Sequence, residues 1–180
     1  MSVEPDSALH HRQSIRLKKY DYAQSGAYFV TICTRNQECV FGDVSDGGIH
    51  LNEYGVVVGE EWLRTALLRD GVAMDAFVVM PNHLHGIIVI NGRGTARRAP
   101  TGERFGQPTV GSIPIIMRAF KSACTNRINA TRDARGTPLW QRNYYEHVIR
   151  DEDDLNRIRQ YIYDNPARWA EDENNPERMK

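Results

Sequence analysis

The stretch FVVMPNHLHGIIVI at 77–90 constrains the fold of this chain more than any other part of the sequence. Its two apolar, β-rich runs flank a Pro81-Asn82 turn signal, which predicts a β-hairpin. His83 and His85 begin the second run, and because side chains alternate along a strand, both imidazoles point to one face. Two histidine nitrogens on a rigid strand form a good half-site for a divalent metal. The alternative is a pair of half-exposed strand histidines with no ligand.

The segments around this hairpin predict further strands and helices. AYFVTICT at 27–34 is rich in aromatic and β-branched residues, which favour a strand. The segment 38–51 predicts a short second strand or hairpin, interrupted by a DGG turn. Helices are expected from 52 to about 69, from 112 to about 129 and from about 153 to 164. The first half of the chain is therefore expected to be antiparallel β structure with a helix packed on one side.

Length and composition predict one domain over 1–180. With 180 residues, of which 41% are hydrophobic and 26% charged, the chain has the composition of an ordinary globular protein with a sizeable core. Three segments are expected to stay outside that core: a flexible tail at 1–13, a mobile loop at 91–111 and an acidic, frayed tail at 170–180.

Cysteine usage, apolar runs and net charge exclude several classes of protein. The three cysteines lack metal-ligand spacing and are expected to be reduced thiols in a cytoplasmic protein. No apolar run of about 18 residues occurs, so no membrane span is expected. The formal net charge is zero, so the binding of a polyanion would have to depend on local patches.

Two local patches of basic residues could bind phosphates. One is in the loop, with Arg93, Arg97 and Arg98, and the other is on the predicted helix at 112–129, with Arg118, Lys121 and Arg127. The alternatives are a disordered surface insertion and a solvated helix face. Lys121 could also extend along the helix surface without contacting a phosphate.

The last predicted helix offers the groups that the histidine strand lacks. Tyr161 and Asn165 are four residues apart, so both lie on one helical face. A phenol can attack phosphorus and form a covalent phosphotyrosine, and a carboxamide oxygen can be a third metal ligand beside two imidazoles. Two alternatives stay open: Tyr161 could be an aromatic residue at the edge of the core, and Asn165, which precedes Pro166, could sit on a frayed last turn.

Five short motifs occur in one order along the chain. They are MPNHLH at 80–85, FKS at 120–122, LWQ at 139–141, HVIR at 147–150 and YIYDNP at 161–166. Together they resemble a REP-associated tyrosine transposase, within the single-tyrosine, His-hydrophobe-His transposases of bacterial insertion sequences. The resemblance implies a ferredoxin-like α+β domain, in which helices pack on one face of a central antiparallel sheet.

The same resemblance implies a reaction and its residues. His83, His85 and Asn165 match the metal ligands, and Tyr161 matches the nucleophile. The implied activity is the cleavage and rejoining of single-stranded DNA through a 5′-phosphotyrosine link, with Mg²⁺ or Mn²⁺, at hairpin-forming or palindromic repeats. The protein would act as a monomer or a homodimer.

Other interpretations of these residues remain open. Tyr144 is a weaker candidate for the nucleophile, and His147 is expected to be a core or surface-turn residue and not a ligand. The chain could also be a domesticated protein that binds hairpin DNA or RNA without cutting it. A zinc-dependent hydrolase, in which the histidines activate water, is less favoured because no Glu or Asp base is evident near His85.

Overall fold

Strand β1 lies in the interior of a four-stranded antiparallel sheet, paired with β5 on one side and with β6 on the other. The computed structural model describes residues 24–91 and 111–179. The sheet has the order β4-β5-β1-β6, with β1 at Gly26–Cys33, β4 at Val72–Met80, β5 at His83–Ile90 and β6 at Tyr145–Ile149. The predicted hairpin around Pro81-Asn82 is confirmed as the β4–β5 pair.

Two helices connect the strands of this sheet. Helix α1 (Glu53–Leu67) precedes β4, and helix α2 (Ile113–Thr131) joins β5 to β6. The succession β1-α1-β4-β5-α2-β6, together with the strand order, is the ferredoxin-like α+β arrangement, so this prediction is confirmed. A small hairpin, β2 (Gly42–Ser45) and β3 (Gly48–Leu51), lies between β1 and α1, as expected for 38–51.

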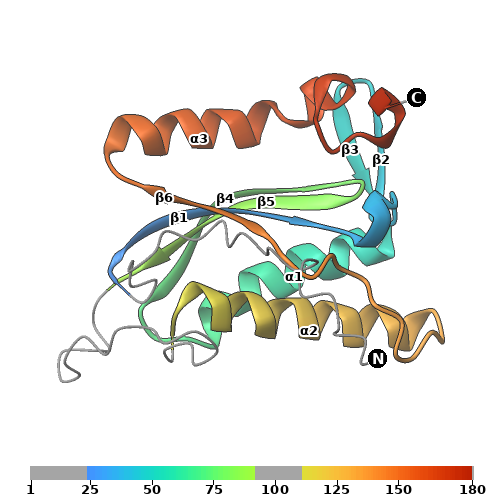
Figure 1. Cartoon of the computed structure of the whole chain (residues 1–180), viewed down its shortest axis with the longest axis horizontal. Coiled ribbons are helices and arrows are strands. Elements are labelled where there is room, and N and C mark those ends of the chain that lie inside the picture. Colours follow the sequence, from blue (N-terminus) through green and yellow to red (C-terminus); the bar gives the residue numbers. More distant parts are fainter. Residues whose placement is uncertain (1–23, 92–110, 180) are drawn as a thin grey trace, which may run out of the picture.

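We predicted that all the helices pack on one face of the sheet, and this part of the prediction is wrong. Helices α1 and α2 cover one face, whereas α3 (Glu152–Asp164) covers the other (Figure 1). The physical reason is that β1 and β5 carry apolar side chains on both faces. Phe29 and Ile87 point away from α1 and α2, and they are buried by Ile158 and Ile162 of α3.

Local sequence determines where α1 begins and how closely it packs. The Asn52 side chain accepts hydrogen bonds from the backbone amides of Tyr54 and Gly55, as an N-cap does. Trp62 of α1 lies directly against Gly86 of β5, where the Cβ of any larger residue would be only 2.3 Å from the indole Cζ2. A glycine is therefore needed at 86 for the helix to reach the sheet.

The segment after α3 is packed and not frayed, which corrects the expectation for 170–180 over its described part. Two short 3₁₀ helices, η2 (Pro166–Glu171) and η3 (Pro176–Met179), lie beside the β2–β3 hairpin (Figure 1). Asp172 and Asn175 are buried between them. Asn and Asp side chains bond to the backbone here, since Asp172 accepts from the Asn174 amide and Asn175 from the Glu177 amide, and these bonds hold the turns.

The tail at 1–13 and the loop at 91–111 are the other two segments that were expected to stay outside the core. The tail at 1–13 lies outside the described residues, and so does the loop at 91–111 except for its two end residues. Within residues 24–91 and 111–179, no helix combines the length and the apolar character that crossing a membrane requires.

Candidate metal and tyrosine site

His83 and His85 lie side by side in the space between β5, α3 and the segment that follows it. Their Nε2 atoms are 3.0 Å apart, and the two side chains are 0% and 2% exposed. The alternative of a half-exposed pair is therefore wrong. The His85 ring stacks on Phe29 with a centroid distance of 5.5 Å, and Trp169 lies beside the His83 ring.

Each histidine is oriented by a hydrogen bond at the nitrogen that faces away from the pair. His83 Nδ1 is 2.8 Å from Asn82 Oδ1, and His85 Nδ1 is 2.8 Å from Thr31 Oγ1. Residues that bond the far ring nitrogen of a metal-binding histidine fix its orientation. Both Nε2 atoms are thereby aimed at one point.

Burial keeps both imidazoles neutral at pH 7. It lowers the pKa of His83 to about 4, with a smaller opposing effect of the Asp172 carboxylate. Burial also lowers the pKa of His85 well below its usual value, and the neighbouring His83 adds to this. Neutral imidazole is the form that binds metals, so the pair is in the state that a metal centre needs.

Tyr161 reaches the histidines from α3, the helix that covers their face of the sheet. Its hydroxyl lies 3.2 Å from His85 Nε2, and its side chain is 42% exposed. Burial and the Asp172 and Glu173 carboxylates raise the pKa of Tyr161 to about 12, so the phenol is protonated at pH 7. Tyr161 is thus a residue at the edge of this site and not only a packing residue.

Tyr163 and Tyr144 point away from the histidines. Tyr163 is 70% exposed, as expected for a residue two positions further along the helix. Tyr144, the rival candidate, packs against the core on the α1–α2 side of the sheet, so it does not face the histidines. His147 Nε2 lies 2.8 Å from Asp154 Oδ2, at the start of α3.

Asn165 is held within the site despite the proline that follows it. Its backbone stays α-helical, with φ −58° and ψ −42°, and its side chain is buried. The Nδ2 group donates to Asp172 Oδ2 at 3.1 Å. The Oδ1 atom is buried and has no hydrogen-bond partner among the described residues. A buried carboxamide oxygen without a partner needs an explanation, and a bound cation is one.

Sequence reasoning missed Asp172, which joins the histidine pair from the segment after α3. Its Oδ2 lies 3.8 Å from His83 Nε2, and ligand atoms of His83, His85 and Asp172 all lie within 4.8 Å of one another. A buried carboxylate beside two neutral imidazoles is costly unless a cation compensates it. Two imidazoles, a carboxylate and an unbonded carboxamide oxygen therefore fit a divalent metal ion.

The site opens to solvent beside Tyr161. A cavity of about 290 Å³ is lined by the phenol, Asn165, Asp172 and Asn174, together with Arg168, Glu171 and Glu173. The cavity therefore reaches the Tyr161 phenol and two of the metal-ligand candidates, Asn165 and Asp172, whereas the two histidines lie buried behind its lining.

No family model matches the chain. A Haemophilus influenzae protein, described as an uncharacterized protein, is 39% identical over 181 residues, which is 96% of this chain and 98% of the relative. The chain belongs to the same family as that protein.

The fold also matches a solved structure of a REP-associated tyrosine transposase bound to a REP hairpin. The TM-score is 0.60 with 21% identity, and the match covers 86% of this chain and 73% of that one. The fold is that of a REP-associated tyrosine transposase, as the ordered motifs predicted.

The basic residues predicted on α2 lie away from the histidine site, since α2 covers the opposite face of the sheet (Figure 1). Lys121 donates to the carbonyls of residues 141–143 within 3.3 Å, so its ammonium group anchors the chain before β6. Arg127 forms ion pairs with Glu60 and Glu61 of α1, both at 2.7 Å. Arg118 is exposed. The loop residues Arg93, Arg97 and Arg98 lie outside the described residues.

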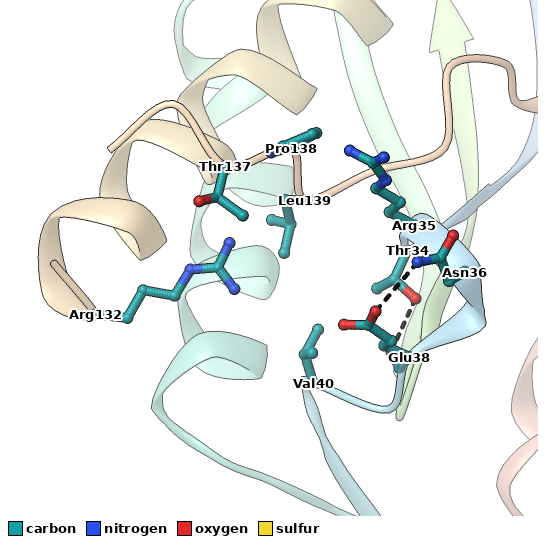
Figure 2. A pocket seen from close by; sticks show the side chains of 9 residues that line it. All are labelled: Thr34, Arg35, Asn36, Glu38, Val40, Arg132, Thr137, Pro138 and Leu139. Carbon is teal, nitrogen blue, oxygen red and sulfur yellow. Dashed lines mark hydrogen bonds between the residues drawn. The ribbon is translucent and has the colours of Figure 1, made fainter. Parts of the chain in front are cut away.

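A second cavity, of about 230 Å³, lies between the turn after β1 and the loop after α2 (Figure 2). In the turn, Asn36 and Gln37 both have positive φ, 56° and 57°. The Thr34 hydroxyl donates to the Glu38 carbonyl at 2.8 Å and closes this turn. Across the cavity, Arg132 is held by Asn129 through its Nε at 2.9 Å.

Proposed function

We propose that this chain is a metal-dependent transposase that cleaves and rejoins single-stranded DNA, with Tyr161 as the nucleophile. The observation that carries the proposal is the convergence of three groups from two elements. The Tyr161 hydroxyl lies 3.2 Å from His85 Nε2, which lies 3.0 Å from His83 Nε2. A structural role would require neither an exposed phenol edge nor two neutral imidazoles aimed at one point.

The proposed reaction begins at the phenol oxygen. The Tyr161 oxygen forms a bond to phosphorus, the bond from phosphorus to the 3′ oxygen breaks, and the departing oxygen ends as a 3′-hydroxyl with the proton that the phenol has lost. The DNA then carries a 5′-phosphotyrosine link. Attack by another 3′-hydroxyl reverses these steps and reseals the strand, and no external energy source is needed because the phosphoester bond is kept throughout.

The residues that would hold the metal are His83, His85 and Asn165, with Asp172 beside them. Mg²⁺ or Mn²⁺ bound there would polarise the phosphate and stabilise negative charge on its oxygens. Without a cation, the phenol is a poor nucleophile, because burial and two carboxylates raise the pKa of Tyr161 to about 12. A cation in the site would counter the effect of these carboxylates.

The proposed substrate is a single strand that folds into a hairpin, at palindromic repeats. The ordered motifs support this substrate class, and so does the solved relative in fold, which was bound to a REP hairpin. Arg97 and Arg98 are kept as proposed phosphate contacts.

The test is the covalent adduct on a hairpin-bearing oligonucleotide. The wild-type protein is expected to form the adduct with Mg²⁺ or Mn²⁺ and not with a chelator. Tyr161→Phe should lose the adduct by at least about 10³-fold and keep its affinity for the oligonucleotide, because only the attacking oxygen is removed. The adduct is measured as a protein band of lower mobility in a denaturing gel.

The matched control is Tyr163→Phe, which changes an exposed tyrosine on the same helix. It should cleave as the wild type does. An adduct that survives in Tyr161→Phe would overturn the assignment.

One observation favours a second candidate, a metal-dependent hydrolase. Asp172 provides the carboxylate beside the histidines that the sequence did not reveal, and a carboxylate there could act as a base toward water. A hydrolase would release a free 5′-phosphate and would still cleave after Tyr161→Phe. A domesticated binding protein would bind the hairpin oligonucleotide without cleaving it and without forming an adduct.

A further inference from the structure

We propose that Asn82 is a positioning residue that holds His83 in the tautomer with its proton on Nδ1, so that Nε2 is free to bind the metal. Asn82 lies in the turn between β4 and β5, and it is fully buried. Its side chain makes three hydrogen bonds, one to the histidine and two to distant parts of the backbone.

The amide of Asn82 can have only one orientation. Nδ2 lies 3.0 Å from the carbonyl oxygen of Gln37 and 2.7 Å from that of Asn174. Both partners are acceptors only, so the amide nitrogen must face them with its two protons. The amide oxygen is left facing His83 Nδ1 at 2.8 Å.

This orientation determines the proton of the imidazole. An amide oxygen can only accept, so His83 Nδ1 must donate, and in the neutral ring the lone pair is then on Nε2. His85 is different, because its Nδ1 faces the Thr31 hydroxyl, which can donate or accept. The tautomer of His83 is therefore fixed by its partner, whereas Thr31 allows His85 either tautomer, so that both Nε2 atoms could hold a cation.

The same side chain joins two separate segments to the histidine. The Gln37 carbonyl belongs to the turn with two positive φ values, which forms one wall of the cavity in Figure 2. The Asn174 carbonyl belongs to the segment that carries Asp172. Asn82 thus connects the site to both segments, and its loss would release both as well as the imidazole.

The experiment reads the tautomer directly, by long-range ¹H–¹⁵N spectra of ¹⁵N-histidine-labelled protein without metal. The wild type should show His83 with its proton on Nδ1. Asn82→Ala should lose this state and bind Mn²⁺ about 10–100-fold more weakly, as measured by titration. Asn82→Asp keeps an acceptor for Nδ1 but loses both donors, so it should retain the tautomer and most of the Mn²⁺ affinity while its melting temperature falls.

The matched control is Asn129→Ala. Asn129 is also buried and donates to a loop carbonyl, that of Thr137 at 2.8 Å, but it lies on α2, across the sheet from the histidines. It should lower the melting temperature without changing the spectrum of His83 or the affinity for Mn²⁺. A wild-type His83 protonated on Nε2 would overturn the proposal, and so would an unchanged tautomer in Asn82→Ala.

The expected change in Mn²⁺ affinity depends on the proposed metal site, whereas the expected tautomer of His83 does not depend on it. If the wild-type protein bound no Mn²⁺ but showed the expected tautomer, the proposed function would fail and the positioning by Asn82 would stand.

Discussion

At the scale of single residues, the candidate site brings together side chains from β5, from α3 and from the segment after α3. His83 and His85 share a strand face, and Tyr161 and Asn165 share a helix face, so their spacing alone paired them correctly. Asp172 lies in an acidic stretch, EDENN at 171–175, where no spacing distinguishes it from its neighbours. Only the path of the chain after Pro166 brings it to His83, and this path depends on hydrogen bonds to residues far away in the sequence, such as Asn82.

Asp172→Asn tests whether this carboxylate is a metal ligand. A cation that binds the folded state raises its stability by about 2.7 kcal/mol at a concentration one hundred times its Kd. The variant should lose most of the rise in melting temperature that MnCl₂ produces in the wild type, because its charge no longer attracts the cation. Calorimetry with and without MnCl₂ measures this difference. Glu171→Gln, the exposed neighbour, should keep the full rise, and an equal rise in Asp172→Asn would exclude it as a ligand.

At the scale of elements, the sheet face on which α3 packs was predicted wrongly, although the sequences of the strands indicate the correct face. In β1 and β5 the apolar residues do not alternate with polar ones, since Phe29 follows Tyr28 and Ile88 follows Ile87. Strands that are apolar on both faces are covered on both faces. The helix itself was correctly bounded, because Asp151 caps it through the Asp154 amide and three acidic residues occupy its first turn.

Asp154 fastens the first turn of α3 to strand β6, and its effect should depend on pH. A hydrogen bond from His147, followed by one from Arg157, lowers the pKa of this carboxyl to about 2, below the value near about 3.9 of an unfolded chain. The folded state therefore gains stability from Asp154 above pH 4 and loses this gain as the pH falls toward 2. Asp154→Asn should lower the free energy of unfolding at pH 7 by about 1 kcal/mol.

Urea denaturation at a series of pH values checks this prediction. The difference between the wild type and Asp154→Asn should close as the pH falls from about 4 to about 2. Asp153→Asn, an exposed neighbour in the same turn, should show a smaller difference at pH 7. A difference for Asp154→Asn that stays constant down to pH 2 would mean that the carboxylate charge contributes nothing.

At the scale of the whole molecule, one face of the sheet carries the larger core and the other carries the candidate site. Trp62, Phe120 and the aliphatic residues around them form the larger core between the sheet and α1–α2. The smaller cluster under α3 leaves room for the histidines, Tyr161 and Asp172 at one end. Sequence periodicity predicted the larger core, but it could not show that the basic residues of α2 would lie on the face away from the site.

If the chain binds single-stranded DNA as we propose, the basic side chains of the loop and of α2 should contribute differently to the affinity. Each phosphate contact on a single strand contributes roughly 0.7 to the slope of log K against log salt. Replacing Arg97 and Arg98 together by Ala should flatten this slope by about 1.4 if both contact phosphates. Arg127→Ala should leave the slope unchanged, because Glu60 and Glu61 already occupy the guanidinium. Fluorescence anisotropy at several salt concentrations measures both, and a slope changed by Arg127→Ala alone would place the DNA on α2.

If β5 supplies metal ligands on one side, as we propose, and core packing on the other, the two sets of residues should vary differently among related sequences. A copy of the gene that had lost cleavage would no longer be under selection at His83 and His85, which could drift to other residues that fit a buried strand. Its Leu84, Gly86 and Ile88 would remain under selection, because they pack against the α1–α2 side, where Trp62 leaves no space at 86. Alternate codons of one short strand would thus distinguish lineages that kept the activity from those that kept only the fold.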